Sequence, residues 1–309
     1  MSTPDAVVIA LDGSEHSTAT LQWGVTEALL RGADVVLAHA TPDPAGVVAL
    51  GWYPLALDVD VDVAAQTYLR DVQRLTRRRA PALGVEARLL RGPAVPSLRD
   101  LSADAQLLVV GAGAGGHRQV GSVAAHLAAH ARCPVAVVRG RPAGSGTPAP
   151  VVVGVDGSAS SLAAAGVAAR EAALREVPLV VVHARPVPRD PYAAGRAAPP
   201  LLLGAEDDAG TTHESAQQVA QALRQAHPGL EVAVELCDGD PPRVLVRAGA
   251  SGQLLVVGSR GLGAFGGMLL GSVSSEVVRS ATGTVLVVHT RAARQGEQDD
   301  VVRRPGPGI

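Results

Sequence analysis

The feature that most limits what this chain can fold into is an internal duplication. Residues 6–40 align with residues 150–184, and both segments carry Asp-Gly-Ser directly behind a short apolar run. Further landmarks recur in the same order, QLLVVG at 106–111 and 253–258, then GSV at 121–123 and 271–273. Repeats of about 20–50 residues indicate solenoids or propellers, whereas this repeat has the length of a whole domain. The sequence therefore predicts two tandem domains of the same fold.

We expect the first domain to span residues 1–140 and the second to span residues 150–290. The segment between them, 141–149, is rich in Gly, Pro and Ser, which is typical of a linker. Residues 291–309 are mostly polar and contain too few apolar side chains to pack against a core. We therefore expect them to form a disordered tail.

Within each copy, short runs of branched apolar residues alternate with stretches of helical spacing such as 63–79 and 215–226. The apolar runs are continuous rather than alternating, which is typical of strands buried on both faces of a parallel sheet. The order predicts an α/β fold with two tandem Rossmann-like domains, each a five-stranded parallel sheet flanked by helices. Two insertions that contain proline, 41–62 and 185–210, follow the second strands and are expected to be mobile loops.

Composition excludes several classes of protein. A net charge of −2 argues against nucleic-acid binding, which generally requires a strongly basic face. No apolar stretch approaches the ~20 residues of a membrane span, and we find no signal peptide, so we expect a cytoplasmic protein without membrane contact. Cys133 and Cys237 occupy non-equivalent positions in the two halves. We expect both to be reduced thiols rather than a disulfide or a zinc site.

A glycine-rich segment of the second copy carries the strongest functional signal. Six glycines lie between positions 258 and 271, after a predicted strand and before a helix expected to begin near Ser272. Glycine allows backbone N–H groups to approach phosphate oxygens closely, and a helix N-terminus adds unpaired N–H groups and a positive dipole. Ser272 and Ser274 could add hydroxyl donors. The alternative is a structural loop in which Ser272 only caps the helix.

Two other glycine patterns, at 111–116 and 261–266, match the G-x-G-x-x-G signature of dinucleotide-binding domains. That signature requires a place after the first strand and an acidic residue about 20 residues later. Both patterns follow the fourth strand instead, and no Asp or Glu occurs between Asp104 and Asp156. We therefore exclude a dehydrogenase.

Polar residues close the first and second strands of both copies. Asp12 and Asp156 follow the first strands, at the edge of the sheet where such folds bind ligands. Each could accept a hydrogen bond from a ribose hydroxyl or cap the next helix, and we favour the ribose role for Asp156. His39 and His183 end the second strands. We expect them to be hydrogen-bonded structural residues rather than catalytic ones.

With these residues in place, each half resembles a universal stress protein domain, and the chain is similar to the tandem form of that family. Gly258, Gly261, Gly271 and Ser272 satisfy the family's ATP-binding pattern G-2x-G-9x-G-(S/T). The resemblance implies a fold of the adenine nucleotide alpha hydrolase type and a stress-response or regulatory protein that binds ATP, with Mg²⁺ as an accompanying ion. It implies ribose contact by Asp156, adenine contacts by Ala184 and Val257, and phosphate contacts by residues 271–274. The candidate site of the second domain is Asp156, Ala184, Val257, Gly258, Arg260, Gly261, Gly271, Ser272, Val273 and Ser274.

The first copy departs from the family pattern. Its stretch from Gly111 to Gly121 is three residues shorter than the stretch from Gly258 to Gly271, and Ala114 stands where the pattern has Gly261. Its weaker candidates are Asp12, Ala40, Gly111, Gly113, Gly121, Ser122 and Val123, with Gly115 and Gly116 as further parts of a substitute cradle. We expect tight ATP binding in the second domain and weak or no binding in the first.

Little in the sequence favours catalysis. The chain contains no lysine, which removes a P-loop lysine and a Schiff-base lysine, and it has no G-x-S-x-G elbow. We therefore expect an adenine-nucleotide-binding protein with negligible hydrolysis. A slow ATPase or phosphotransferase and a nucleotide-free interaction module are the alternatives. As assembly states we expect a homo-oligomer or an intramolecular pseudo-dimer of the two domains.

Overall fold

The computed structural model describes residues 5–41, 58–113, 120–139, 149–185, 208–262 and 270–290. The predicted tail, the predicted linker as far as residue 148, and Ala114, Gly115 and Gly116 lie outside these described residues.

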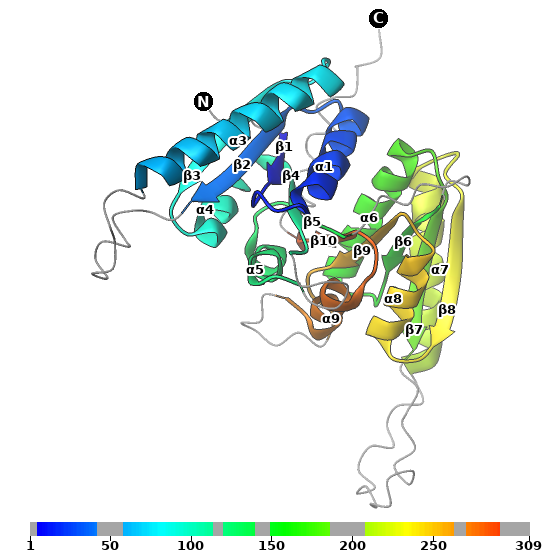
Figure 1. The fold of residues 1–309 in the computed structure, drawn as a ribbon. Helices are drawn as coiled ribbons and strands as arrows, with labels where there is room; N and C mark the ends of the chain where they lie inside the picture. Colours follow the sequence, from blue (N-terminus) through cyan, green and yellow to red (C-terminus); the bar gives the residue numbers. More distant parts are fainter. Residues whose placement is uncertain are drawn as a thin grey trace, which may run out of the picture.

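The described residues form two successive α/β units with the same order of elements, as the duplication predicts (Figure 1). The first unit consists of β1 (Ala6–Ala10), α1 (Ser17–Arg31), β2 (Val35–Thr41), α3 (Asp58–Arg79), β3 (Val85–Arg91), α4 (Ala94–Leu101), β4 (Ala105–Gly111), α5 (Ser122–His130) and β5 (Val135–Val138). The second consists of β6 (Val151–Gly154), α6 (Ala159–Leu174), β7 (Leu179–Arg185), α7 (Asp208–Ala226), β8 (Val232–Asp238), α8 (Pro241–Ala250), β9 (Leu254–Gly258), α9 (Ser272–Ser280) and β10 (Val285–Val288). The predicted alternation of strand and helix is therefore confirmed.

Each unit contains a five-stranded parallel sheet in which the first strand lies between the second and the fourth. The strand orders are β3-β2-β1-β4-β5 and β10-β9-β6-β7-β8. The strand order reverses at β1 and at β6, so a crevice opens at the carboxyl ends of these strands and their neighbours. Both candidate aspartates follow these two strands.

The two sheets join edge to edge into one ten-stranded sheet. β5 and β10 pair antiparallel, with Val137 opposite Val285 and Ala136 opposite Leu286. The edges of β5 and β10 are thus covered within the molecule, and β3 and β8 are the outer strands of the joined sheet. The two domains form the intramolecular pseudo-dimer that the sequence left as one of two possibilities; a homo-oligomer remains a prediction.

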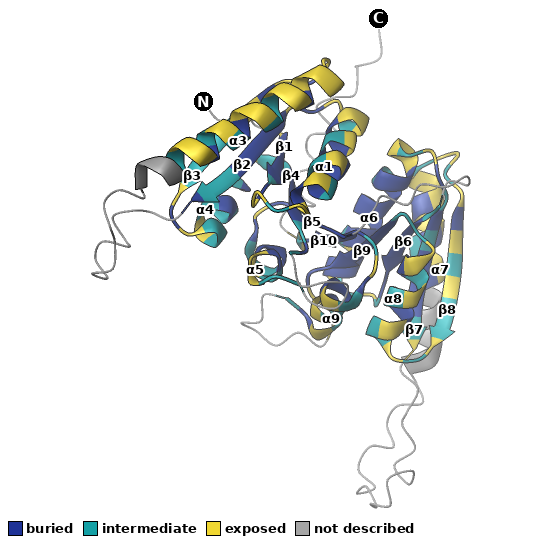
Figure 2. Cartoon of the chain, viewed as in Figure 1, coloured by how far each residue is buried: buried dark blue, intermediate teal, exposed yellow. Residues whose placement is uncertain are grey.

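Helices cover both faces of the sheet and bury two apolar layers (Figure 2). Residues from α1, α3, α6 and α7 pack on one face, and residues from α4, α5, α8 and α9 pack on the other. Alternate strand residues point to opposite layers, as Ile9 and Val8 do in β1. Because both faces are covered, inner strands such as β1 and β9 are apolar throughout, which explains the continuous runs in the sequence.

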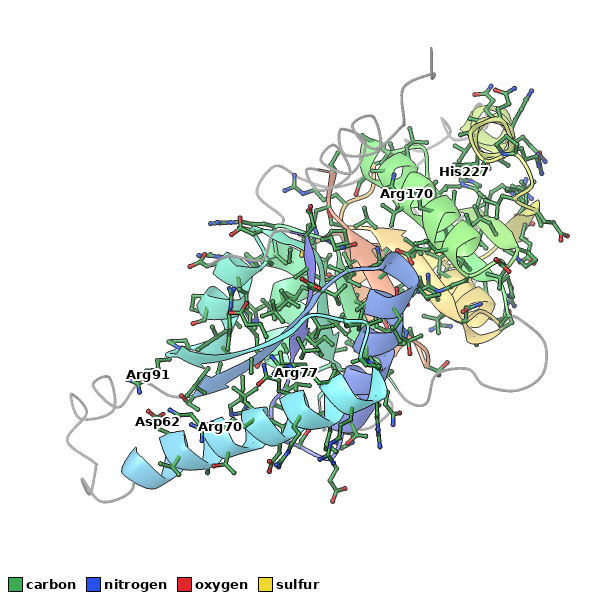
Figure 3. The ribbon with its side chains drawn as sticks, turned by 90° about the horizontal axis from the view of Figure 1, so that it is seen from above. Asp62, Arg70, Arg77, Arg91, Arg170 and His227 are labelled. Atoms are coloured by element: carbon green, nitrogen blue, oxygen red, sulfur yellow. The ribbon has the colours of Figure 1, made fainter. Side chains whose placement is uncertain are left out.

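The helices after the second strands begin earlier than the sequence predicted. α3 starts at Asp58 and α7 at Asp208, so the expected insertions 41–62 and 185–210 are shorter than predicted at their C-terminal ends. Residues 42–57 and 186–207 lie outside the described residues. Asp62 belongs to α3 and forms an ion pair of 2.8 Å with Arg91 of β3, which ties helix to strand (Figure 3).

A buried cluster of four charged side chains connects α1 of the first domain with α6 of the second. We call Glu27, Arg31, Glu171 and Arg175 the interdomain quartet. Each arginine pairs with the glutamate of its own helix and with that of the partner helix, as Arg31 does with Glu27 at 3.3 Å and with Glu171. Glu27 corresponds to Glu171 in the duplication, and Arg31 to Arg175, so the quartet follows the internal symmetry.

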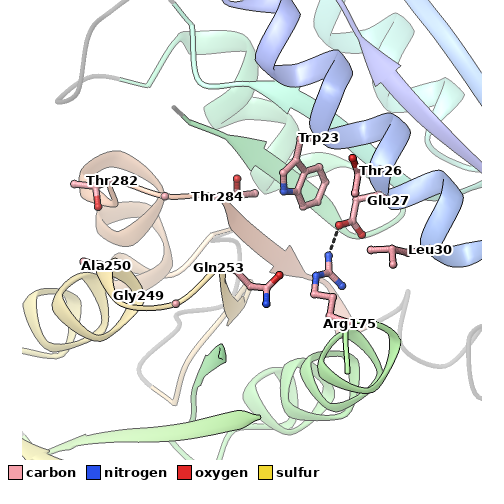
Figure 4. A pocket seen from close by; sticks show the side chains of 12 residues that line it. Trp23, Thr26, Glu27, Leu30, Arg175, Gly249, Ala250, Gln253, Thr282 and Thr284 are labelled. Atoms are coloured by element: carbon pink, nitrogen blue, oxygen red, sulfur yellow. Dashed lines mark hydrogen bonds and ion pairs between the residues drawn. The ribbon is translucent and has the colours of Figure 1, made fainter. Parts of the chain in front are cut away.

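The quartet carries its charges out of contact with water. The side chains of both glutamates are 3% exposed, and that of Arg175 is 7% exposed. Burial opposes ionisation of Glu171, but the two arginines hold its pKa below the ordinary value. Burial and the neighbouring Glu171 carboxylate instead raise the pKa of Glu27. A cavity of about 270 Å³ lies beside the quartet, between α1 and the second domain, and Trp23, Glu27, Gln253 and Arg175 help to line it (Figure 4).

A second polar contact crosses the domain boundary at the end of β5. Arg139, which is 8% exposed, donates hydrogen bonds to the carbonyl oxygens of Val278 at 2.6 Å and Arg279 at 2.8 Å. These carbonyls belong to the last turn of α9, where backbone acceptors lack helical partners and a positive charge is favourable. None of the helices in the described part of the chain is long and apolar enough to cross a membrane.

Candidate functional site

The candidate site of the second domain lies at the carboxyl ends of β6, β7 and β9. These three strands are neighbours in the sheet, so the segments that follow them meet at one edge. Asp156 comes two residues after the end of β6, Ala184 is the penultimate residue of β7, and the glycine loop follows β9. The structure therefore brings the predicted residues of three distant segments together.

Asp156 is held in a tight turn at the start of α6. Gly157 adopts a φ of +83°, a left-handed conformation that favours glycine, and Ser158 N–H donates to Asp156 Oδ1 at 3.0 Å. Ser158 is the N-cap of α6, and its Oγ accepts a hydrogen bond from Ser161 N–H at 3.2 Å. The capping role that was the alternative for Asp156 is thus performed by Ser158.

The second carboxylate oxygen of Asp156 reaches across to the glycine loop. Leu262 N–H donates to Asp156 Oδ2 at 3.1 Å. Burial alone would raise the pKa of Asp156, but hydrogen bonds from Ser158, Ser161 and Leu262 outweigh it and lower the pKa below the ordinary value. At neutral pH the side chain is therefore an anion, and each carboxylate oxygen can accept more than one hydrogen bond, which suits an acceptor for hydroxyl donors.

The glycines of the loop are required by close packing in ways that the sequence did not reveal. A Cβ on Gly258 would lie 2.6 Å from Ser160 Oγ of α6, and a Cβ on Gly261 would lie 2.6 Å from Asp156 Oδ2. Gly258, Gly261 and Gly271 do not occur among the residues with positive φ. A side chain at Gly261 would therefore meet the neighbouring Asp156 carboxylate rather than strain a left-handed backbone.

The loop closes on itself before α9 begins. Gly271 N–H donates to the carbonyl oxygen of Ser259 at 2.8 Å, and a Cβ on Gly271 would approach Gly261 N to 3.4 Å. Arg260 is exposed on this narrow base of the loop, and its N–H donates to Ser160 Oγ at 3.2 Å. Residues 263–269, which include Gly263 and Gly266, lie outside the described residues.

The helix after the loop begins at Ser272, as predicted, with Gly271 as its N-cap and no side-chain cap. The first N–H groups of an α-helix lack intrahelical partners, so this end of α9 presents donors and a positive dipole to the crevice. Ser272 is exposed and Val273 is half-buried. Ser272 is therefore not the N-cap, and its hydroxyl has no hydrogen-bond partner among the residues that the structure describes.

Ser274 does not fit the role that the sequence assigned to it. Its side chain is buried, and its Oγ donates to the carbonyl oxygen of Gly258 at 2.6 Å. The hydroxyl thus fastens the first turn of α9 to the end of β9 instead of facing a ligand. This correction follows from the helical period, which turns the third residue of α9 toward the sheet.

The apolar candidates lie on one face of the sheet. Val257 is buried in the layer under α8 and α9, and Ala184, half-buried at its rim, packs against the same layer. Neighbouring His183 is buried, and its Nδ1 lies 2.9 Å from the carbonyl oxygen of Val155, directly before Asp156. The expectation of a structural histidine is confirmed.

The first domain repeats this frame with a different loop. Asp12 Oδ1 accepts from Ser14 N–H at 3.0 Å and from the hydroxyls of Ser14 and Ser17, each at 2.6 Å. Burial alone would raise the pKa of Asp12, but these hydrogen bonds outweigh it and lower the pKa below the ordinary value. His39 Nδ1 lies 2.7 Å from the carbonyl oxygen of Leu11, as its counterpart does in the second domain.

The loop that follows β4 closes in the same way as the loop after β9. Gly121 N–H donates to the carbonyl oxygen of Ala112 at 2.7 Å, and Gly113 adopts a φ of +89°. Gly113 occupies the position that Arg260 has in the second domain. Of the other weaker candidates, Gly111 would place a Cβ 2.8 Å from Thr20 Oγ1, Ala40 is half-buried, and Ser122 and Val123 begin α5 on the exposed side.

Free thiols are confirmed for both cysteines. Burial raises the pKa of Cys133 to about 12, so this thiol stays protonated and inert at neutral pH. Within the described ranges, no three His, Cys, Asp or Glu side chains are grouped closely enough to hold a metal ion.

Comparison with known proteins finds the same family in both halves. The universal stress protein family matches residues 4–139 and again residues 149–289. Universal stress protein Rv2005c of Mycobacterium tuberculosis is 33% identical over 293 residues, covering 91% of this chain and 96% of that protein. Universal stress protein Rv2623 of the same organism is 32% identical over 294 residues, covering 91% and 95%. The crystal structure of a universal stress protein from Archaeoglobus fulgidus has a TM-score of 0.69, with 18% identity and coverage of 92% and 96%, and supports the fold.

Proposed function

This chain belongs to the universal stress protein family as a tandem member, and from that premise we propose that its second domain binds ATP as a nucleotide-dependent regulator. The observation that carries the proposal is the bridge from Asp156 to the glycine loop at Leu262. The bridge joins an anionic acceptor to the loop that carries the exposed Arg260 and leads to the start of α9, which has no side-chain cap.

The residues fit the parts of an adenine nucleotide in order. Asp156 would accept hydrogen bonds from the ribose hydroxyls, for which a carboxylate is a strong acceptor. The first N–H groups of α9, Ser272 Oγ and the guanidinium of Arg260 would bind the phosphates. Ala184 and the edge of Val257 would lie against the base. Any Mg²⁺ would then be held mainly by phosphate oxygens and water, which is common for this ion.

We propose binding with little or no hydrolysis. Phosphoryl transfer requires charge stabilisation at the γ-phosphate and an oriented nucleophile. The chain contains no lysine. The carboxylate of Asp156, the acidic group that we assign to the crevice, is engaged at the ribose end. A slow ATPase or phosphotransferase remains the enzymatic alternative.

The regulatory part of the proposal rests on α6. This helix starts directly behind Asp156 and carries Glu171 near its other end, where it joins the interdomain quartet. A nucleotide that tightens the turn at Asp156 would therefore act on a rigid element that ends at the domain boundary. Nucleotide would shift the arrangement of the domains by the difference in its affinity for the two arrangements.

We expect about one tight ATP site per chain. Gly113 stands where the second domain has Arg260, and the stretch from Gly111 to Gly121 is three residues shorter than its counterpart. The first domain thus offers less positive charge and a shorter loop for the phosphates. Two equal tight sites would contradict this assignment.

The direct test is to denature the purified protein and identify any released nucleotide by chromatography, and then to titrate nucleotide-free protein with ATP by calorimetry. We expect ATP or one tight site, with Asp156→Ala weakening affinity about 10- to 100-fold, the value of a hydrogen bond to a charged group. Asp12→Ala is the matched control and should leave the tight site unchanged. Absence of any binding would favour the nucleotide-free interaction module, and sustained turnover near ~10 s⁻¹ would favour an enzyme.

A further inference from the structure

Two histidines lie one helical turn apart on α5, away from the candidate nucleotide site of the second domain. His126 is exposed and His130 is half-buried. Residues four apart on a helix share one face. Their rings are stacked, with centroids 5.9 Å apart and planes inclined by 21°. The two imidazoles therefore project side by side from the same strip of α5.

The hydrogen bonds of the two rings fix which nitrogen carries the proton. His126 Nδ1 lies 2.7 Å from the carbonyl oxygen of Ser122, and His130 Nδ1 lies 2.8 Å from that of His126. A carbonyl oxygen can only accept, so each Nδ1 must donate its hydrogen. The Nε2 atom of each neutral ring is then left with a lone pair. A histidine ligand commonly has this arrangement, with one nitrogen on the metal and the other donating to a carbonyl.

We propose that His126 and His130 form a two-histidine site for a late transition-metal ion such as Zn²⁺, Ni²⁺ or Cu²⁺. The same spacing of two histidines on a helix provides the zinc ligands of H-E-x-x-H proteins. In the described parts of the chain no third His, Cys, Asp or Glu side chain completes a group of three, so water would fill the remaining positions. Imidazole nitrogen favours these metals over Mg²⁺ and Ca²⁺, which prefer oxygen.

The duplication provides a comparison within the molecule. The positions of His126 and His130 correspond on α9 to Glu276 and Ser280, whose side chains hydrogen-bond to each other at 2.6 Å. The second domain therefore has no counterpart of the pair, and one metal ion per chain is expected.

The test uses untagged, full-length protein freed of metal with a chelator and kept free of nucleotide. Titration with NiCl₂ and with ZnCl₂ by calorimetry should give one saturable site, and MgCl₂ should give none. His126→Gln and His130→Gln should each weaken Ni²⁺ binding at least 10-fold. The control is His227→Gln, at the residue that directly follows α7 (Figure 3). This variant should bind Ni²⁺ as the wild type does.

A second readout separates the pair from adventitious ions. Ni²⁺ should protect both rings from acylation by diethyl pyrocarbonate, as mapped by peptide mass spectrometry, and circular dichroism should show that the variants remain folded. Wild-type affinity in both Gln variants, or no saturable binding of Ni²⁺ or Zn²⁺ by the wild type, would overturn the proposal. Neither outcome depends on whether the second domain binds ATP.

Discussion

Replacing Gly261 by alanine should act on nucleotide binding through Asp156. The new Cβ would lie 2.6 Å from Asp156 Oδ2, closer than real Cβ contacts allow. Asp156 is held on its other oxygen by Ser158 N–H at 3.0 Å, so its carboxylate has little freedom to move aside. The carboxylate must therefore rotate, which breaks its bond with Leu262 N–H and displaces the proposed ribose acceptor.

The size of the effect follows from the bond that is lost. A hydrogen bond to a charged group is worth about 1.5–3 kcal/mol, so the affinity for ATP should fall about 10- to 100-fold. Gly261 does not have a positive φ, so alanine should stabilise through the unfolded chain by about 0.4–1 kcal/mol. This gain offsets only part of the lost bond with Leu262, so the free energy of unfolding should fall by about 1–2 kcal/mol.

A double-mutant cycle measured by calorimetry can test this route of action. In the Asp156→Ala background the clash no longer exists, so Gly261→Ala should change the ATP affinity less than about 3-fold. The two substitutions would then be coupled by more than about 1 kcal/mol, as expected for residues in contact. Thermal denaturation of all four proteins is the control for folding.

Additive effects in that cycle would refute the reasoning. If Gly261→Ala weakens ATP equally with and without the Asp156 carboxylate, the Cβ obstructs the nucleotide itself. Unchanged affinity in the wild-type background would remove both Asp156 and the loop from the site.

Three further perturbations test other parts of the structure. Arg175→Met leaves two buried carboxylates short of a partner, so it should lower the free energy of unfolding by about 3–5 kcal/mol and lower the melting temperature. The control Arg74→Met, in an exposed ion pair, should cost less than about 1 kcal/mol. Equal shifts in melting temperature for the two variants would contradict the burial of the quartet. At pH 8 a thiol reagent should modify Cys237 quickly but Cys133 only after denaturation, because burial raises the Cys133 pKa to about 12; fast native reaction at both would disagree. The folded pKa of Asp156 is lowered, so its contribution to stability is present above the ordinary aspartate pKa of about 3.9 and is lost as the pH falls through the folded pKa. The difference in melting temperature between wild type and Asp156→Asn should therefore be present at pH 7 and vanish in strong acid, and a difference that persists there would contradict the sign.

The sequence alone predicted the helices and strands of each domain because they depend on local patterns of apolar and polar residues. Continuous apolar runs identify strands covered on both faces, and each pattern occurs twice because the domain is duplicated. It also predicted that Asp156 and the glycine loop meet, since the ends of parallel strands face one edge. The start of α9 at Ser272 followed from the glycines before it.

The sequence did not reveal which contacts require particular residues in the loop and in α9. Gly258 and Gly261 fit a phosphate cradle by pattern, yet their tight neighbours are Ser160 and Asp156, which lie about 100 residues away in the chain. Ser274 has a hydroxyl that could donate to a phosphate, but the helical turn directs this hydroxyl to the carbonyl oxygen of Gly258. Such contacts depend on how α6 and α9 pack on the sheet, which no local pattern encodes.

Only the tertiary structure decided how the two copies join. Glu27 and Arg31 are spaced four residues apart, a pattern that usually marks the solvated face of a helix. Their burial depends on α6 presenting the same pair from the other copy, and on β5 pairing with β10 to bring the helices together. The sequence determines two copies of one fold because each copy's apolar pattern is satisfied within about 140 residues. The junction is decided only in three dimensions, because its charges are stable out of water only when both copies supply them at once.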